Sequence, residues 1–172
     1  MQDILDFTLY YNSYKKKLFN YTLRMTGNRM ASEDILQTVF MRFYQNLGKI
    51  RHGVAIEFWL FKSVRNEIFT WLKSKKRLTE NYLSSDISEI EIESDGTADT
   101  QIIEFEQREI VLSAINSLPA DQREVILLKE YSGLSYDEIS EVVGIEKSLV
   151  KSRLYSARQK LIAQLSDKMK NE

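Results

Sequence analysis

The chain has 172 residues, 43% of them hydrophobic, and its 24 Lys and Arg nearly balance 25 Asp and Glu. It has no cysteine and one histidine, His52, which excludes disulfides, cysteine nucleophiles and metal sites built from Cys or from several His. No apolar run approaches the roughly 18 residues of a membrane span, and Met1–Leu9 lacks the cations of a signal peptide, so we expect a cytoplasmic protein without membrane insertion.

Hydrophobic residues recur at helical spacing along almost the whole chain, and no stretch alternates apolar and polar residues over a useful length. This pattern predicts an all-α protein. Charge is partitioned along it: residues 1–78 carry fourteen Lys and Arg against six Asp and Glu, and residues 79–109 carry ten Asp and Glu against Arg108 alone. We therefore expect two small helical domains, residues 1–78 and 101–172, joined by a flexible acidic linker at residues 79–100.

Three helices are expected in the N-terminal domain. The first covers residues 3–25, and the second runs from a cap at Ser32 to about Leu47. The third covers residues 58–77, after a loop at residues 48–56. Three polar residues of the second helix fall on its outer face: Asp34, Gln37 and Arg42.

The third helix is both aromatic and basic, and the loop before it carries Arg51 and His52. Aromatic rings stack on unpaired bases, and cations follow the phosphate chain. Core packing is the favoured explanation for Trp59 and Phe61. If the whole helix served only the core, the run of cations from Lys73 to Arg77 would be ordinary solvated surface, and the basic loop before the helix would have no explanation. We therefore expect the helix as a whole to contact nucleic acid.

Residues 135–161 are the most informative stretch of the C-terminal domain, which is otherwise expected to hold helices from residue 101 and, after Leu118-Pro119, to about Tyr131. Ser135 and Glu138 have the spacing of a capping box, and Gly144 marks a turn. The helix after the turn repeats apolar residues at a helical period: Val150, Leu154, Ala157, Leu161 and Leu165.

This pattern predicts a helix-turn-helix, in which the N-terminal end of the second helix meets base edges. Four residues lie at that end: Lys147, Ser148, Lys151 and Ser152. Arg153 and Arg158 add positive charge that can neutralise phosphates. The alternative for this segment alone is a surface helical hairpin with a solvated cationic face.

Three stretches, in this order, resemble the bacterial RNA polymerase sigma factors of the extracytoplasmic-function type, a branch of the sigma-70 superfamily. EDILQTVFMRFYQNL at Glu33–Leu47 is similar to the family's region 2.2, and FWLFKSVRNEIFTWLKSKKR at Phe58–Arg77 is similar to regions 2.3 and 2.4. Leu118–Leu161 is similar to region 4. Two features depart from the family pattern: Ser140 replaces the usual alanine, and GKIRHGVAIEF differs from the commoner glycine-rich loop.

The resemblance implies a promoter-specificity subunit, not an enzyme, that directs core RNA polymerase to minus-ten and minus-thirty-five elements and helps to melt DNA. It implies that Asp34, Gln37 and Arg42 meet core polymerase, whose contacts with the protein are the clamp helices of the β′ subunit and the β flap. The minus-ten contacts it implies are Arg51, His52, Trp59, Lys62, Arg65, Asn66 and Lys73. The minus-thirty-five contacts are Lys147, Ser148, Lys151, Ser152, Arg153 and Arg158. It also implies an anti-sigma factor as a further partner.

Two other function classes remain open from the residues alone. A stand-alone repressor or activator could use the same helix-turn-helix, and it would bind its duplex site without polymerase. An enzyme acting on nucleic acid would need a metal or acid–base constellation, but no phosphate-binding glycine loop, zinc spacing or nucleophile elbow appears. We expect no cofactor and no metal.

Overall fold

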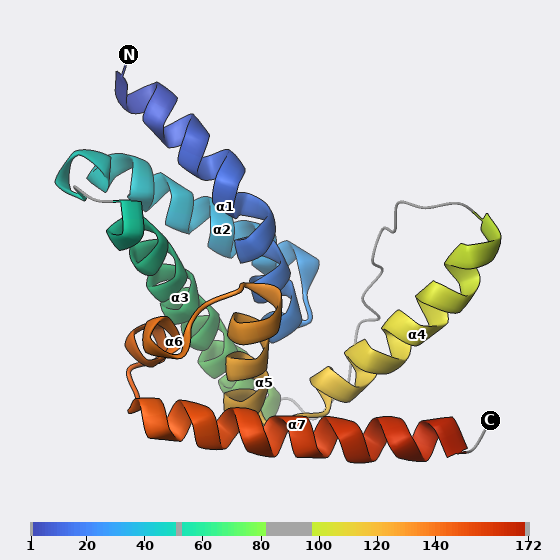
Figure 1. Ribbon diagram of the computed structural model, residues 1–172. Coiled ribbons are helices and arrows are strands. Elements are labelled where there is room, and N and C mark those ends of the chain that lie inside the picture. The colour runs from blue at the N-terminus through green and yellow to red at the C-terminus, as the bar shows by residue number, and fades with distance from the viewer. Residues whose placement is uncertain (1, 51–52, 82–97, 171–172) are drawn as a thin grey trace.

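The computed structural model describes residues 2–50, 53–81 and 98–170, which are helical with short connections and without a β-strand (Figure 1). The all-α prediction is therefore confirmed. The N-terminal half contains α1 (Gln2–Thr26), α2 (Arg29–Asn46), the 3₁₀ turn η1 (Leu47–Lys49) and α3 (Gly53–Asn81). The C-terminal half contains α4 (Ala98–Asn116), α5 (Ala120–Ile126), the π-helical segment η2 (Leu127–Tyr131), α6 (Tyr136–Val143) and α7 (Lys147–Lys170). Arg51, His52 and most of the predicted linker lie outside the described residues.

The second helix begins earlier than the sequence predicted. Asn28 is its N-cap, and the Asn28 side-chain oxygen accepts a hydrogen bond from the backbone N–H of Ala31 at 2.8 Å. Ser32 is buried inside the helix, where its hydroxyl donates to the carbonyl of Asn28 at 2.7 Å. The predicted cap at Ser32 is wrong, because the chain turns at Gly27 (φ 63°) and the next residue is already a good cap.

The third helix is longer at both ends than the predicted residues 58–77. It begins at Gly53, inside the predicted loop, and continues to Asn81, inside the predicted linker. No glycine or proline follows Gly53 within this helix, and the residues at its C-terminal end include good helix formers such as Leu78 and Glu80. Acidic composition begins near residue 80, but charge alone does not end a helix.

The helices α1, α2 and α3 pack together in the N-terminal half. Residues with no exposed surface lie where the three helices meet: Leu18, Tyr21, Val39, Phe43, Leu60, Phe61, Val64 and Ile68. Because these residues recur at three- and four-residue steps, each helix presents one apolar stripe to the others. The expectation that Phe61 belongs to the core is confirmed, and Trp59 lies half-buried with its ring 5.9 Å from that of Phe43.

In the C-terminal half, α7 packs across α4, α5 and α6. The predicted inner stripe of this helix is confirmed at Val150, Leu154 and Ala157, each at most 1% exposed. Pro119 stands immediately before α5, where its missing N–H costs nothing. Figure 1 shows α7 running along one edge of the molecule, with α4 rising from its C-terminal part.

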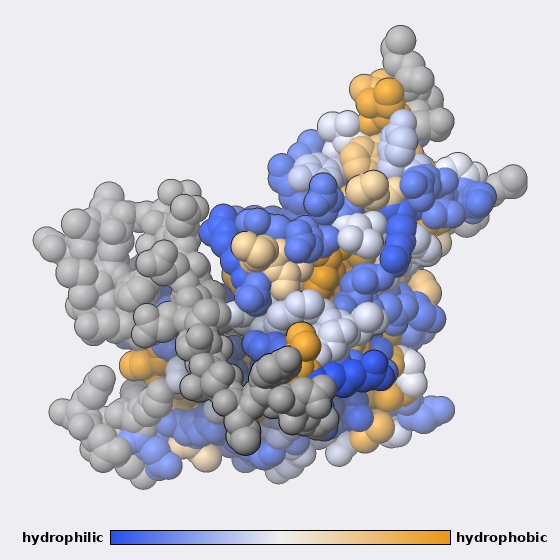
Figure 2. Space-filling model, turned by 180° about the vertical axis from the view of Figure 1, so that it is seen from behind, coloured by the Kyte–Doolittle hydropathy of each residue, from blue (hydrophilic) through white to orange (hydrophobic). Residues whose placement is uncertain are grey.

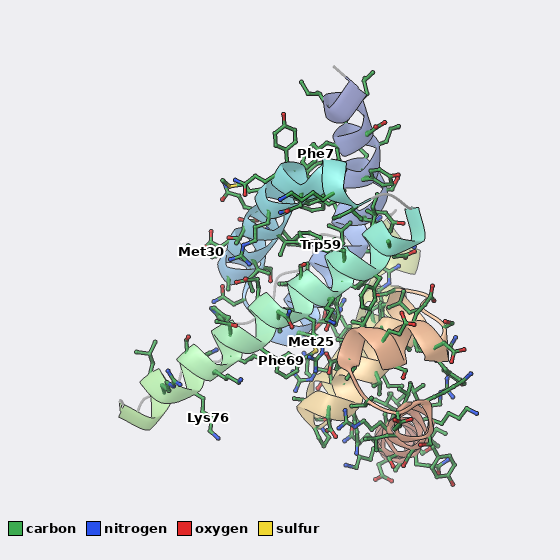
Figure 3. All side chains as sticks on the ribbon, turned by 90° about the vertical axis from the view of Figure 1, so that its left-hand side faces the viewer. Phe7, Met25, Met30, Trp59, Phe69 and Lys76 are labelled. Atoms are coloured by element: carbon green, nitrogen blue, oxygen red, sulfur yellow. The ribbon has the colours of Figure 1, made fainter. Side chains whose placement is uncertain are left out.

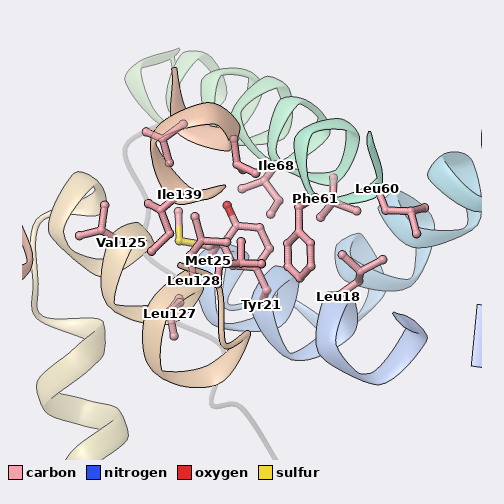
Figure 4. Close-up of a cluster of buried hydrophobic side chains, with 14 of the residues drawn as sticks. Leu18, Tyr21, Met25, Leu60, Phe61, Ile68, Val125, Leu127, Leu128 and Ile139 are labelled. Atoms are coloured by element: carbon pink, nitrogen blue, oxygen red, sulfur yellow. The ribbon is translucent and has the colours of Figure 1, made fainter. Parts of the chain in front are cut away.

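The two halves pack against each other and share one hydrophobic cluster (Figure 4). The helix α6 contacts α3, and α5 and η2 contact α1. Tyr21 and Phe61, whose ring centroids are 6.1 Å apart, face Leu128 and Ile139 in this cluster. Arg24 of α1 lies 5.7 Å from the ring of Tyr131, and burial lowers the pKa of that guanidinium. The halves therefore form a closed arrangement in this structure.

Candidate nucleic-acid interface

The helix-turn-helix has the local geometry that its sequence predicted. The hydroxyl of Ser135 accepts from the Glu138 N–H at 3.1 Å, and the Glu138 carboxylate accepts from the Ser135 N–H at 2.7 Å, which completes the capping box. Gly144 adopts the left-handed conformation with φ 75°, and its N–H donates to the carbonyl of Ser140 at 2.8 Å. The hydroxyl of Ser140 donates to the Ile145 carbonyl at 2.5 Å and so braces the turn.

Four of the predicted minus-thirty-five residues share one exposed face at the start of α7. Lys147, Ser148, Lys151 and Ser152 are all exposed, and their spacing of one and four residues places them side by side. Lys147 reaches Asp137 of α6 at 2.9 Å, but that pair is largely open to water and holds the lysine weakly. This face is therefore free to approach a DNA groove.

The two predicted arginines have contacts within the C-terminal half. The Nε of Arg153 lies 3.4 Å from a carboxylate oxygen of Asp121 in α5, and its side chain is only 24% exposed. Arg158 donates to Glu130 at 2.8 Å. The largely buried Arg153 therefore helps to hold α7 on α5, whereas the Arg158–Glu130 pair is open to water and contributes little.

The predicted minus-ten residues of α3 fall on more than one face. Lys62, Asn66 and Lys73 are exposed, whereas Trp59 lies between α3 and α2 (Figure 3). The ammonium of Lys62 lies 5.2 Å from the centroid of the Phe58 ring, a cation–π contact. Arg65 lies on the side that faces the C-terminal half and is not presented to solvent with the other cations.

Arg65 forms a buried cluster with Glu124 of α5. Its Nε donates to Glu124 Oε1 at 2.5 Å and a terminal nitrogen donates to Oε2 at 3.3 Å. Tyr21 of α1 donates to the same Oε1 at 3.2 Å, and Glu124 is only 1% exposed. Burial raises the pKa of Glu124, and the hydrogen bond and charge of Arg65 oppose that rise.

Burial also raises the pKa of Tyr21 well above its ordinary value of 10.0, and the charge of Glu124 adds to the rise. Since the folded-state pKa exceeds the unfolded one, the stabilisation from the neutral phenol is complete below about pH 10 and is lost as pH rises. We expect Tyr21→Phe to lower the free energy of unfolding by about 1–3 kcal/mol at pH 7. We also expect the free energy of unfolding of this variant to fall less steeply above about pH 10. Urea titrations between pH 7 and 11 test this, with the exposed Tyr155→Phe as the matched control. Equal curves for both variants would contradict it.

An open apolar groove of about 950 Å³ runs between α1 and α2. Its walls are mainly aromatic and aliphatic: Phe7, Tyr11, Phe19, Leu36, Phe40, Met41 and Tyr44. Its polar rim holds three cations, one acid and two amides: Lys15, Lys16, Arg29, Glu33, Gln37 and Gln45. Gln37, a predicted polymerase contact, lies on the rim. Asp34 is exposed on the same helix, and Arg42 donates to Glu67 of α3.

Sequence reasoning did not find the groove or the role of Glu124. The groove had a weak signal, since Met41 and Tyr44 are large apolar residues that the α2 core stripe leaves outside; they are 58% and 50% exposed. Glu124 had one as well, because a carboxylate beside Val125 and four residues before Leu128 falls on an apolar stripe. Neither signal names the partner, because the groove and the cluster join elements far apart in the sequence.

The part of the chain that the structure describes holds no group of three or more His, Asp or Glu able to bind a metal ion. The same residues include no helix long and apolar enough to cross a membrane.

Comparison with known proteins adds the family. The sequence pattern of Sigma-70 region 2 matches residues 10–78, and that of Sigma-70, region 4 matches residues 108–161. The chain is 30% identical over 162 residues to the ECF RNA polymerase sigma factor SigW of Bacillus subtilis. The aligned region covers 90% of this chain and 86% of SigW. The chain belongs to the extracytoplasmic-function sigma factors. The ECF RNA polymerase sigma-E factor of Escherichia coli K12 is 33% identical over 135 residues, 73% of this sigma factor and 69% of that protein.

Solved structures agree with this assignment. This sigma factor is similar to RpoE of Bartonella quintana, crystallised with the anti-sigma factor NepR, with a TM-score of 0.77, 26% identity and coverage of 94% and 97% of the two chains. CnrH, in complex with the cytosolic domain of CnrY, has the same fold, with a TM-score of 0.63 and 21% identity over 94% and 88% of the chains. The protein is a promoter-specificity subunit of RNA polymerase that acts in transcription initiation, and the family's role is recognition of promoters.

Proposed function

We propose that this sigma factor reads the minus-thirty-five element with the exposed end of α7. The observation that carries the proposal is the single face formed by Lys147, Ser148, Lys151 and Ser152 at the N-terminal end of the recognition helix. Lysines at such a face contact phosphates or guanine, and serines contact either base edges or phosphates. Arg153 supports the helix through Asp121, and both Arg153 and Arg158 add positive charge at its flank.

The minus-ten element is assigned to α3 and the loop before it. Lys62, Asn66 and Lys73 are exposed along α3 and can follow a phosphate chain, and Trp59 supports this helix from beneath. Arg51 and His52 belong to the same proposed surface but lie outside the described residues. Extruding a base from the stack costs a few kcal/mol, so a surface that stabilises the extruded base favours melting.

Core polymerase is assigned to the groove between α1 and α2. The groove has an apolar floor around Phe40 and Met41 and a rim with more cations than acids, which suits a helix with one apolar face and acidic flanks. Helix-in-groove recognition of this kind fits the β′ clamp helices that the family resemblance implies. Gln37 adds a polar contact at the rim, Asp34 is exposed on the same helix, and Arg42 of this helix pairs with Glu67 of α3.

We expect Gln37→Glu to weaken binding to core polymerase by about 10-fold, because a carboxylate at the rim repels the acidic flanks of the partner helix. Analytical gel filtration or interferometry with purified core measures the affinity. Gln107→Glu in α4 is the matched control, since it adds the same side chain at an exposed site away from the groove. Equal affinities for the two variants would show that the groove is not the core-binding surface.

The functional units are residues 1–78 and 101–172, with residues 79–100 as the connection and the β flap as the contact of the second unit. The protein works in the cytoplasm, where its polymerase is, and it has no catalytic activity of its own. An anti-sigma factor is a further partner, in line with the complexes described for RpoE of Bartonella quintana and for CnrH.

Reconstitution with core polymerase tests the proposal against a stand-alone regulator. We expect the purified protein to co-elute with core and to give transcripts from fragments of the host genome only when both are present. A stand-alone regulator gives a gel shift with duplex DNA in the absence of polymerase and no transcript with it. A folded preparation that neither binds core nor directs transcription would overturn the proposal.

A further inference from the structure

The C-terminal half of the chain covers one side of the proposed DNA-binding helix. The helix α6 packs against α3 (Figure 1). Phe61 of α3 and Leu134 and Val142 of the C-terminal half line one small cavity of about 40 Å³. This side of α3 is thus packed against protein and closed to any other partner.

Arg65 is the charged residue at the centre of this contact. Its guanidinium meets both oxygens of Glu124, and its other side stacks over the ring of Phe69 with 4.5 Å between the guanidinium carbon and the ring centroid. Two donors aimed at two oxygens of one anion is the geometry by which arginine also holds a phosphate. An aromatic ring beneath the guanidinium is a feature that nucleic-acid sites share.

We propose that Glu124 is an internal competitor for nucleic acid: its carboxylate occupies Arg65 in place of a backbone phosphate, so that closure of the two halves and DNA binding on α3 exclude each other. The inference rests on the proposed minus-ten role of Arg65. It adds a regulatory device to that role, because the free chain then blocks one of its own DNA contacts.

The contact is suited to open. A buried ion pair is a weak source of net stability, since desolvation of the two charges offsets much of their attraction. Three acids, Glu57, Glu138 and Glu141, line the same small cavity between α3 and α6, and no cation of the described residues lines it with them. The pair therefore specifies how the halves meet, while the apolar cluster supplies most of the attraction.

Because only open molecules bind DNA at this site, the apparent affinity of the free chain equals the affinity of the open form multiplied by the fraction of molecules that are open. Core polymerase removes this penalty if it holds the halves apart, and an anion that competes for Arg65 does the same. Glu124→Gln keeps the size of the side chain and its acceptor for Tyr21, but it removes the charge that mimics phosphate. The variant is expected to open more readily and to bind single-stranded DNA more tightly.

The chain has no cysteine, so two introduced cysteines can be spin-labelled without a background. We would label Asn20→Cys in α1 and Gln159→Cys in α7, both exposed, and measure the distance between the labels by pulsed electron resonance. The probe is a 15-nucleotide single strand of mixed sequence. Wild type should show one narrow distance that lengthens and broadens when the probe is added. Glu124→Gln should show the broad distribution without probe and bind the probe at least about 5-fold more tightly.

Two further variants make the outcome specific. Glu67→Gln removes the same charge from another arginine pair within the N-terminal half and should leave the distance and the probe affinity unchanged. The double variant Arg65→Gln/Glu124→Gln should open as the single variant does without the gain in affinity. An unchanged distance when the wild type binds the probe would overturn the proposal, and that measurement does not depend on any variant folding. Opening without a gain in affinity in Glu124→Gln would overturn it equally.

Transcription with core polymerase, measured in parallel, separates this inference from the proposed function. Probe-dependent opening without promoter-dependent transcripts would contradict the proposed function and leave the competition standing. Promoter-dependent transcripts together with a distance that no probe changes would contradict the competition alone.

Discussion

Replacing Lys147 and Lys151 together with alanine should weaken promoter binding by the holoenzyme about 10-fold at moderate salt. Both ammonium groups lie on the exposed face at the start of α7. Each phosphate contact releases counterions from the DNA when the protein binds, so fewer counterions are released when a contact is lost. The plot of log affinity against log salt should therefore lose about 1 unit of slope for Lys151→Ala and about 2 for the double variant. Fluorescence anisotropy on a promoter fragment across a salt series measures both quantities.

The matched control is Lys17→Ala, which removes an exposed lysine from α1, outside the groove and the recognition helix. It should change neither the affinity nor the slope. A salt slope that Lys17→Ala lowers as much as Lys151→Ala does would contradict the assignment of α7 as a DNA contact and would indicate a diffuse effect of net charge.

Phe61→Ala is expected to lower the free energy of unfolding by about 3–5 kcal/mol, enough to unfold a marginally stable domain. Phe61 has no exposed surface, lies 6.1 Å from the Tyr21 ring and lines the cavity between α3 and the C-terminal half. The truncation leaves a void at a place where three elements meet, so the surrounding side chains cannot all move in to fill it. Urea unfolding followed by circular dichroism at 222 nm gives the value.

Leu78→Ala on the same helix serves as the comparison, because Leu78 is 61% exposed and should cost less than about 0.5 kcal/mol. If Phe61→Ala cost no more than Leu78→Ala, the close packing of the two halves around Phe61 would be wrong. If Phe61→Ala changed the distance between the two halves but left the free energy of unfolding unchanged, Phe61 would contribute to closure and not to the core of the N-terminal half.

Local structure in this protein follows closely from local sequence. The stripe Val150, Leu154 and Ala157 predicted the buried face of α7, and Ser135 with Glu138 predicted a cap whose two bonds are both present. The Ser32 cap failed because Asn28, four residues earlier, is also a good capping residue and leaves Ser32 to hydrogen-bond inside the fold. The choice between two nearby caps depends on burial, which the local pattern does not contain.

The arrangement of the halves is the part that sequence could not supply. Arg65 and Glu124 stand 59 residues apart, with residues 82–97 between them outside the described structure. The sequence around Arg65 is the same whether this side of α3 is exposed to DNA or covered by the C-terminal half. Apolar residues such as Ile68 and Leu128 are equally consistent with the core of one half and with a contact between halves. Only the three-dimensional structure separates these alternatives, and it places the Arg65 guanidinium against the carboxylate of Glu124.

The central claim is that this sigma factor and core polymerase together recognise and open a promoter. Permanganate footprinting of a promoter fragment from the host genome tests it most directly, because the reagent oxidises thymines only where the strands have separated. We expect reactive thymines beginning in the minus-ten element when core and this protein are both present, and none with either alone. A footprint that is the same with core alone, or a bound complex without reactive thymines, would contradict it.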